Sequence, residues 1–194
     1  LTANYDAMVS TWMLEQAGHI QPRRLSFSAA LSQNLRYGEN PHQSASFYVD
    51  ESINSGIGAA YQIQCKELSY NNINDADAAL ELVNEFTESD GAAAVIIKHA
   101  NPCGVGVANN LVEAYKAALH CDTTSAFGGI VAVNQIIDEE SAREITKVFT
   151  EVVIAPGITD GGRKVFSSKS NLRLLTADKS TNLGCQSKVI RHVS

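Results

Sequence analysis

Two side chains that can exchange protons stand next to each other after the most apolar run of the sequence. Lys98 and His99 directly follow the run Ala92–Ile97. An ammonium group beside an imidazole lowers the proton affinity of both, which helps to keep the imidazole neutral and able to accept a proton. The pair therefore predicts acid–base chemistry at a site that also holds a cation. The alternative is a solvated lysine beside a packed histidine, and the pair alone does not separate the two.

The run Ala92–Ile97 predicts a strand that is buried on both faces, as in a parallel sheet, because it is apolar without alternation. In open α/β sheets, ligands bind just beyond the carboxyl ends of such strands. Neighbouring side chains of a regular strand point to opposite faces, so Lys98 and His99 reach one ligand only if the strand ends at or before Lys98. Asn101-Pro102 gives the strand a reason to end, because proline lacks an N–H and restricts the residue before it.

Three stretches with glycine are further candidates for ligand contacts. Arg36-Tyr37-Gly38 offers a guanidinium, an aromatic face and a permissive backbone, which suits a phosphate beside a planar ring; the alternative is a solvated loop arginine. Phe127-Gly128-Gly129 predicts either amides exposed to a ligand or a tight entry into a strand. Gly104-Val105-Gly106 lacks the third glycine of a dinucleotide fingerprint, since position 109 is Asn, and close approach of the backbone to a ligand or another turn explains it as well.

A metal site is not expected. Asn101-Pro102-Cys103 resembles the Pro-Cys start of a zinc deaminase motif, but the sequence has Asn101 where that motif requires Glu and Gly106 where it requires a second Cys. The four cysteines are scattered, with no C-x-x-C pair. This distribution favours reduced thiols in a cytoplasmic protein.

The charge and hydropathy of the chain exclude several classes of function. The formal net charge is −6 and no block of Lys and Arg occurs, which argues against a nucleic-acid-binding or membrane-surface protein. No apolar run approaches the roughly 20 residues that cross a bilayer, and no signal peptide is visible. The first residue is Leu1 rather than Met, so we expect the chain to be a piece of something longer.

Hydrophobic periodicity predicts an α/β protein whose sheet is largely parallel. We expect helices over 1–17, whose apolar stripe packs; from about 75 to 88, with Asn74 as its cap; from 111, capped by Asn110; and from Asp138 to about Phe149. We expect strands over 25–31, 45–49, 92–97, 130–133, 152–155 and 172–176. A loop is expected over 35–43, and 164–169 receives no assignment.

Five motifs in this order resemble one family: LRYGENPHQ (35–43), LSYNNINDADA (68–78), KHANPCG (98–104), SAFGG (125–129) and IAPG (154–157). The family is the bacterial bifunctional AICAR transformylase/IMP cyclohydrolase family, and the similarity is to its transformylase part over about 1–176. The resemblance implies formyl transfer from 10-formyltetrahydrofolate to the 5-amino group of AICAR. It also implies a three-layer α/β/α, cytidine-deaminase-like fold with a largely parallel or mixed sheet and no zinc.

The resemblance also assigns site residues. The Lys-His pair of the family is catalytic, which here means Lys98 and His99. The substrate-binding positions that it implies are Arg36, Tyr37, Asn74, Asn101, Gly128, Glu151 and Lys169. Asn101 would also orient His99. Glu151 and Lys169 are carried over from motifs whose local sequence differs from that of the relatives.

The resemblance further implies how this chain relates to a longer enzyme. Residues 1–18 match a linker helix at the end of the cyclohydrolase domain, and 19–194 match the first half of the transformylase domain. We therefore expect a fragment that is inactive alone, from a cytoplasmic homodimer that acts on AICAR and a folate. A monovalent cation would be ligated outside this chain. Two alternatives remain open at this point: a non-catalytic module that binds purine nucleotides, and a purely structural α/β domain.

Overall fold

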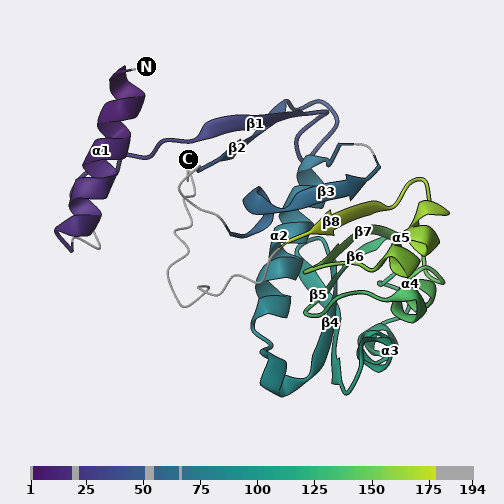
Figure 1. The fold of residues 1–194 in the computed structure, drawn as a ribbon. Helices are drawn as coiled ribbons and strands as arrows, with labels where there is room; N and C mark the ends of the chain where they lie inside the picture. Colours follow the sequence, from purple (N-terminus) through teal and green to yellow (C-terminus); the bar gives the residue numbers. More distant parts are fainter. Residues whose placement is uncertain (1, 19–21, 51–54, 66, 178–194) are drawn as a thin grey trace. The chain divides into compact units, whose positions relative to one another are not determined.

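A computed structural model describes residues 2–18, 22–50, 55–65 and 67–177. The chain divides into two compact units (Figure 1). One unit comprises Leu1–Asn34 and Ser46–Ile53, and the other comprises Leu35–Ala45 and Asn54–Ser194. The domain boundary expected between residues 18 and 19 stays a prediction.

The smaller unit holds the helix α1 (Thr2–Gln16) and most of a two-stranded sheet of β1 (Ala30–Leu35) and β2 (Ala45–Val49). The predictions of the first helix and of the strand over 45–49 are confirmed. The strand predicted over 25–31 begins later, because β1 forms where the chain can pair with β2 across the loop that joins them.

The apolar stripe predicted for α1 is not buried. Tyr5 is 68% exposed, Met8 53% and Trp12 59%, and none of the described residues of α1 is buried. The contacts of α1 with the segment that follows it are polar. The hydroxyl of Thr11 donates to the carbonyl of Ser26 at 2.8 Å, and that of Ser28 donates to Asn4 Oδ1 at 2.6 Å. The prediction of a packing helix is therefore wrong for the described residues.

The larger unit is built on a six-stranded sheet in the order β3-β8-β7-β6-β4-β5. The strands are β3 (Tyr61–Gln64), β4 (Ala92–Lys98), β5 (Asn101–Ala108), β6 (Gly129–Val133), β7 (Thr150–Ala155) and β8 (Arg173–Thr176). β6, β7 and β8 are parallel, whereas β4 is antiparallel to both β5 and β6, and β3 is antiparallel to β8. The mixed sheet is confirmed. The prediction that β4 lies in a parallel part of the sheet is wrong. A two-residue turn after β4 returns the chain at once as the antiparallel strand β5.

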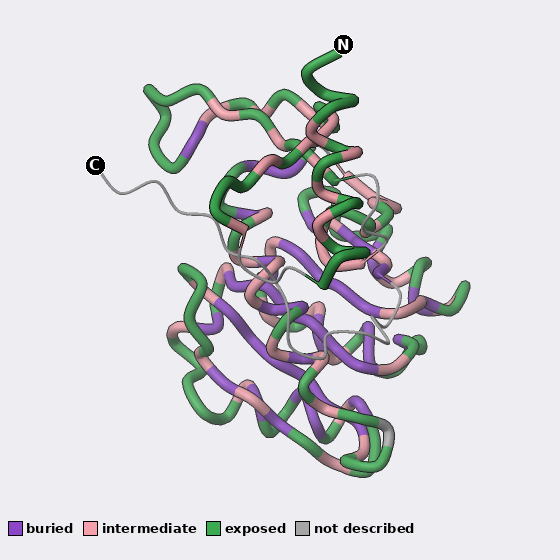
Figure 2. The backbone as a smooth tube through the Cα atoms, turned by 90° about the vertical axis from the view of Figure 1, so that its left-hand side faces the viewer, coloured by how far each residue is buried: buried purple, intermediate pink, exposed green. Residues whose placement is uncertain are grey.

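Helices cover both faces of this sheet (Figure 1). Ala92, Ala94 and Ile96 of β4 face α3 (Leu111–Cys121), α4 (Glu139–Ile145) and α5 (Asp160–Ser167). The alternate residues Ala93, Val95 and Ile97 face α2 (Tyr70–Asn84). Every residue of β4 before Lys98 is therefore buried. Figure 2 shows that such buried stretches gather in the interior of the larger unit.

Side-chain caps decide where the helices begin. Asn110 and Asp138 cap α3 and α4 as predicted. α2 begins at Tyr70 rather than near Asp75, so the prediction of Asn74 as its cap is wrong. Ser69 caps α2 instead: its Oγ accepts from the Asn72 N–H at 3.2 Å, and Asn72 Oδ1 accepts from the Ser69 N–H at 3.2 Å. This reciprocal pair is a capping box with Asn in place of Glu or Gln.

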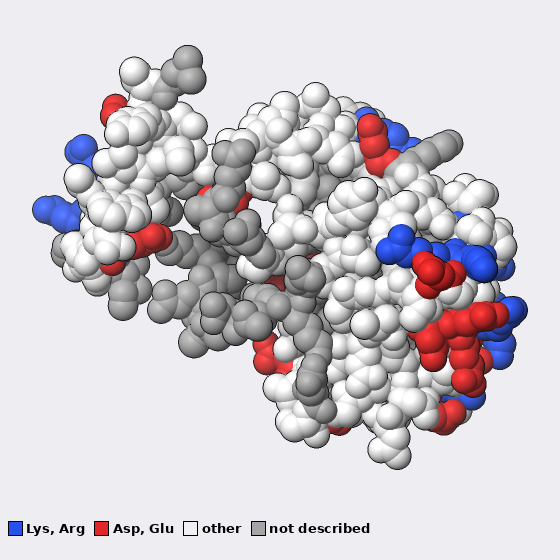
Figure 3. Space-filling model, in the orientation of Figure 1, with Lys and Arg blue, Asp and Glu red and all other residues white. Residues whose placement is uncertain are grey.

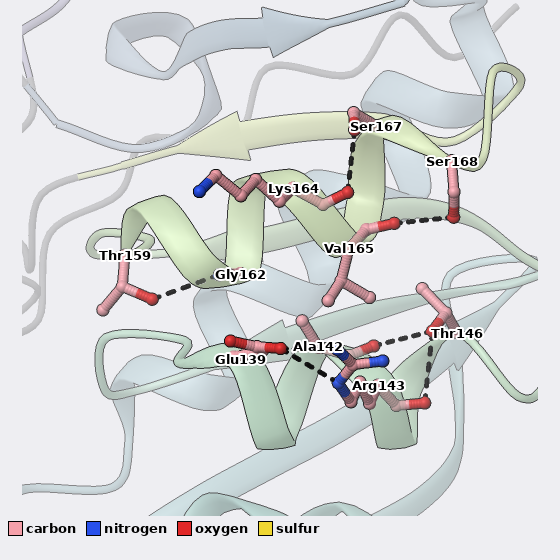
Figure 4. A network of polar contacts seen from close by, with 10 residues as sticks. All are labelled: Glu139, Ala142, Arg143, Thr146, Thr159, Gly162, Lys164, Val165, Ser167 and Ser168. Atoms are coloured by element: carbon pink, nitrogen blue, oxygen red, sulfur yellow. Dashed lines mark hydrogen bonds and ion pairs between the residues drawn. The ribbon is translucent and has the colours of Figure 1, made fainter.

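α4 ends at Ile145, before the predicted end at Phe149. The hydroxyl of Thr146 donates to the carbonyls of Ala142 and Arg143, at 2.8 and 3.1 Å, and closes the last turn (Figure 4). The stretch 164–169, which received no assignment, begins inside α5, whose cap is Thr159. β3 and the short 3-10 turns Ile57–Ala59 and Glu88–Asp90 were not predicted.

Charged side chains of both signs gather over α4 and α5 in Figure 3. Two ion pairs lie along α4 and its end: Arg143 with Glu139 at 2.5 Å and Lys147 with Glu144 at 2.6 Å. Because the two signs alternate, this face offers no extended basic surface.

Gly104 and Gly106 let β5 pack directly against α3. A Cβ added to Gly104 would overlap the carbonyl oxygen of Ala118, and one added to Gly106 would overlap that of Ala114. The glycine pair that resembles part of a dinucleotide fingerprint therefore serves close approach of the backbone to a helix. This contact fixes the edge of the sheet beside β4.

We predict that Gly106→Ala strongly destabilises the protein. Its Cβ would meet helix backbone, which cannot move aside, so the cost should exceed the roughly 1–3 kcal/mol of ordinary overpacking. Urea unfolding measures this difference. Gly157→Ala is the matched control, since a Cβ there lies 3.4 Å from the Ile136 side chain, and we expect it to stay within about 0.5 kcal/mol of the parent. Equal midpoints for both variants would contradict the close packing.

Candidate functional site

The turn between β4 and β5 carries Lys98 and His99. β4 ends at Lys98, which pairs with Asn101 across the turn, so that His99 and Ala100 form a two-residue loop. Both loop residues have positive φ, 52° for His99 and 56° for Ala100. This is the backbone of a type I′ turn, which normally uses Asn and Gly at these positions. The strand therefore ends where the pair requires it to end.

Polar groups hold this turn from two sides. Asp75 of α2 accepts two backbone N–H groups on its two oxygens, from His99 at 3.3 Å and from Ala100 at 2.8 Å. Asn101 Nδ2 donates to the carbonyl of His99 at 2.7 Å. Asn101 therefore orients the backbone of His99.

Lys98 bonds to the loop that precedes β6. Its Nζ donates to the carbonyl of Phe127 at 2.9 Å. The next residue, Gly128, has φ 75° and donates its N–H to the carbonyl of Phe149 at 2.8 Å. The rings of Phe127 and Phe149 lie 5.3 Å apart. An ammonium has three donors, so the bond to Phe127 fixes the side chain and leaves N–H groups for a ligand.

A carboxylate lies near Lys98 on the loop that follows α3. Asp122 accepts from the N–H groups of Thr124 and Ser125, at 3.1 and 2.9 Å, and from the Ser125 hydroxyl at 2.6 Å. The bonds from Ser125 hold the pKa of Asp122 below its ordinary value, and the charge of Lys98 adds to this effect. Burial raises the pKa of the Cys103 thiol, and the charge of Asp122 acts in the same direction.

Glu151 is held by a buried amide. Asn72 is 5% exposed, and its Nδ2 donates to Glu151 Oε2 at 2.9 Å. The same Asn72 side chain belongs to the capping box of α2, in which its Oδ1 accepts from the Ser69 N–H. Glu151 lies one residue into β7 and is half-buried. The capping box of α2 therefore also fixes the direction of this carboxylate.

The loop with Arg36 and Tyr37 belongs to the same compact unit as the turn. Gly38 donates its N–H to the carbonyl of Gln43 at 2.9 Å, which closes the loop on itself. The guanidinium carbon of Arg36 lies 5.7 Å from the centre of the Tyr37 ring. Asn71 of α2 donates to the carbonyl of Glu39 at 3.4 Å, which ties the loop to the first turn of α2.

The strand register brings most of the predicted site residues to one end of the strands, where β4 ends and β6 and β7 begin. We call this end the edge of the candidate site. Ile97 pairs with Ile130, and Gly129 pairs with Thr150. The carboxyl end of β4 therefore lies beside the amino ends of β6 and β7, because β4 runs against them. The predicted residues Lys98 and His99 lie at the carboxyl end of β4. They do not lie beyond the carboxyl ends of the parallel strands, where the general rule for open parallel sheets places a ligand.

This edge gathers Lys98, His99, Asn101, Gly128 and Glu151. The remaining positions are less closely joined to the turn. Asn74 is exposed on α2, one residue before Asp75. Lys169 precedes β8, and its carbonyl accepts from Gln64 Nε2 at 3.0 Å. Within the described residues, no hydrogen bond or ion pair joins Arg36, Tyr37 or Lys169 to Lys98 or His99.

Two residues of this edge were missed by sequence reasoning. Asp75 and Asn72 were treated as polar residues around the start of a helix, yet they hold the turn and Glu151. The motif that contains both was visible in the sequence, but their partners lie 24 to 79 residues away. Only the packing of α2 against β4 and β7 brings them together.

A separate cleft of about 570 Å³ lies at the opposite edge of the sheet, at the carboxyl ends of β7 and β8. Its lining includes Tyr61, Ile136, Pro156, Thr159 and Arg163. None of the predicted site residues lines it. The described residues contain no group of three or more His, Cys, Asp or Glu side chains that could hold a metal ion, and no described helix is long and apolar enough to cross a membrane.

Comparisons with known proteins agree with this arrangement of motifs. The family described as "AICARFT/IMPCHase bienzyme" matches residues 1–194. The chain is 58% identical over 193 residues to the bifunctional purine biosynthesis protein PurH of Roseobacter denitrificans, covering 100% of the chain and 36% of the relative. It is 61% identical over 175 residues to the PurH protein of Paracoccus denitrificans, covering 90% of the chain and 33% of the relative.

The match over the whole chain defines the class of protein: an α/β domain of a bienzyme family. The chain belongs to the AICARFT/IMPCHase bienzyme family. The resemblance inferred from the five motifs is thus confirmed. The chain spans about a third of the length of the curated relatives it matches.

A solved structure of RibD from Acinetobacter baumannii is also similar, with a TM-score of 0.41 and 14% sequence identity. The similarity covers 52% of this chain and 34% of RibD.

We predict that Ser125→Ala raises the pKa of Asp122 toward its ordinary value of 3.8, because the Ser125 hydroxyl is the largest cause of the shift. NMR titration of the Asp122 carboxyl carbon measures this change. A carboxyl whose folded pKa is lowered adds stability above its unfolded pKa, and this stability is lost as pH falls through the folded pKa. The difference in the free energy of unfolding between parent and variant should therefore be present at neutral pH and shrink in acid.

Thr124→Ala is the matched control for this titration. Thr124 donates to Asp122 through its backbone N–H, which alanine keeps. The pKa of Asp122 should stay unchanged in this variant. An equal rise in both variants would remove the Ser125 hydroxyl as the cause.

Proposed function

We propose that this chain forms part of the transformylase site of a bifunctional purine biosynthesis enzyme. The reaction transfers a formyl group from 10-formyltetrahydrofolate to the 5-amino group of AICAR. The observation that carries the proposal is the β4–β5 turn, which presents Lys98 and His99 side by side in the chain beyond a buried strand. Membership of the bienzyme family over residues 1–194 supports the same reaction.

His99 is the proposed base. The amine of AICAR is a weak nucleophile, because its lone pair is delocalised into the ring and the carboxamide. As its nitrogen bonds to the formyl carbon, His99 takes the proton that the amine loses, either directly or through the neighbouring carboxamide. A positioned base contributes on the order of 10²–10⁴ to the rate. The exposed position of His99 leaves room for a substrate.

Lys98 is proposed to assist the breakdown of the tetrahedral intermediate. The tetrahedral intermediate carries an oxyanion, and it collapses when the bond between the formyl carbon and the folate nitrogen breaks. The ammonium of Lys98 stabilises the oxyanion or donates a proton to the leaving nitrogen. A fixed charge of this kind contributes on the order of 10²–10³. The bond from Lys98 to the Phe127 carbonyl supplies the fixed position.

The remaining residues of the site are proposed to bind AICAR. Arg36 and Tyr37 bind the phosphate and ribose region, since a guanidinium pairs with phosphate oxygens and an aromatic ring covers a planar or sugar face. The other proposed contacts are Asn74, Asn101, Gly128, Glu151 and Lys169. The amide of Asn72 supports this role for Glu151, because it fixes the carboxylate toward the same edge of the sheet.

We also propose the fold type of this chain and the assembly of the complete enzyme. The fold is of the cytidine-deaminase-like α/β/α type without zinc, and the complete enzyme is a cytoplasmic homodimer that also carries IMP cyclohydrolase activity and binds a monovalent cation outside this chain. This chain alone does not catalyse formyl transfer. Helices on both faces of a mixed sheet support the three-layer part of this proposal.

We predict that Lys98→Met and His99→Ala each lower formyl transfer about a hundredfold or more in a protein that extends this chain to the length of its relatives. AICAR binding, measured by calorimetry, should change little. Lys116→Met and His120→Ala are matched controls, because both side chains are exposed on α3. Near-normal turnover of His99→Ala would end its assignment as the base. AICAR binding without any transfer in the parent protein would favour a non-catalytic nucleotide-binding module.

We predict that Arg36→Ala mainly weakens AICAR binding in the same protein. Loss of a charge-assisted bond to phosphate costs roughly 1.5–3 kcal/mol, so KM should rise by about tenfold or more with little change in kcat. Steady-state kinetics with AICAR and with its dephosphorylated nucleoside measure this contribution. Arg163→Ala is the control, because Arg163 lines the separate cleft. An unchanged KM would remove Arg36 from the site.

A further inference from the structure

We propose that Asp75 is a positioning residue for the Lys98–His99 pair, a role that rests on the proposed function of that pair. Its carboxylate lies beneath the β4–β5 turn and bonds to backbone, so it acts through the turn rather than on a substrate. Three observations carry the proposal: the conformation of the turn, the identity of its residues, and the geometry of the carboxylate.

The turn adopts a conformation that its own residues disfavour. His99 and Ala100 both have φ between 50° and 60°. A Cβ in this left-handed region approaches the neighbouring carbonyl, so two adjacent residues other than glycine rarely adopt it. Gly at the second position would remove much of this strain, yet the sequence has Ala100 there. An interaction outside the turn must therefore hold it.

Asp75 supplies that interaction with both of its oxygens. Oδ2 accepts from the His99 N–H at 3.3 Å, and Oδ1 accepts from the Ala100 N–H at 2.8 Å. Bonds from backbone N–H groups to an ionised carboxylate are stronger than those between neutral groups. An amide or hydroxyl could not accept both donors in this way, because only the carboxylate offers two acceptor oxygens on one plane.

The place of Asp75 on α2 links the turn to the core. Ala76, Ala79 and Leu80, which follow it on α2, are buried against β4 and its neighbours. The carboxylate is therefore anchored on a packed helix, while the turn it holds is exposed. Lys98 is fixed from the other face by the Phe127 carbonyl. Asp75 thus completes a clamp that sets the direction of both side chains.

The test combines a structural and a kinetic measurement. Asp75→Ala should speed hydrogen exchange at the Ala100 amide by about tenfold or more and lower kcat by roughly tenfold to a hundredfold, with KM for AICAR little changed. The kinetics use the protein extended to the length of its relatives, and exchange is read by NMR in the same protein. Asp75→Asn should fall between parent and Asp75→Ala, since an amide keeps one acceptor.

Rescue by glycine separates positioning from general damage to the fold. Ala100→Gly, added to Asp75→Ala, should restore kcat to within about threefold of the Ala100→Gly single variant, because glycine adopts positive φ without strain. A variant that had merely lost stability would not be rescued by a glycine in the turn. Failure of this rescue would overturn the proposal.

Glu81→Ala is the matched control, because Glu81 is an exposed carboxylate on the same helix. Parent-like exchange at Ala100 in Asp75→Ala would overturn the positioning role. Parent-like kcat in Asp75→Ala, with Lys98→Met inactive, would overturn it as well. Failure of the proposed function would give a different result, because Lys98→Met and His99→Ala would then retain formyl transfer. Faster exchange of the Ala100 amide in Asp75→Ala would in that case still show that Asp75 holds the turn.

Discussion

The reversal of the chain between β4 and β5 is the constraint on which the rest of the site depends. A strand buried on both faces cannot present two neighbouring side chains to one ligand, because alternate residues point to opposite layers. The chain meets this constraint by ending the strand at Lys98 and turning within two residues, both with positive φ. The turn is stabilised by α2 on one face and by the Phe127 carbonyl on the other. Each layer of the fold thus contributes to a single turn.

The packing of β5 explains why the turn can be so short. β5 returns along β4 as the edge strand of the sheet, and α3 lies directly on it because Gly104 and Gly106 carry no Cβ. Pro102 is tolerated because an edge strand needs no donor on its outer side. The same glycines that resemble part of a nucleotide motif therefore have a structural task, which is to let α3 approach the backbone of β5.

Much of the fold could be predicted from local pattern, and the exceptions have a common physical cause. Ala92–Ile97, the caps Asn110 and Asp138, and the short strands 130–133 and 172–176 depend on nearby residues, so they were predicted correctly. The direction of β4, the start of α2 and the burial of α1 depend on partners far along the chain. In the candidate site, Lys98 and His99 could be singled out from the sequence because they are adjacent and follow a buried strand. Asp75 and Asn72 were not recognised, because what they bind is set by the packing of α2 against the sheet.

The antiparallel direction of β4 also decides which edge of the sheet the site occupies. Parallel strands β6 and β7 begin at this edge, and so does α2, whose capping box lies beside Glu151. The carboxyl ends of β7 and β8, where a ligand is expected in a purely parallel sheet, border the separate cleft instead. A single reversed strand thus brings the turn with Lys98 and His99 to the amino ends of its neighbours, where the Phe127 carbonyl accepts from Lys98. In the proposed site, the hairpin of β4 and β5 therefore takes the place of the strand-to-helix loop that contacts ligands in other α/β proteins.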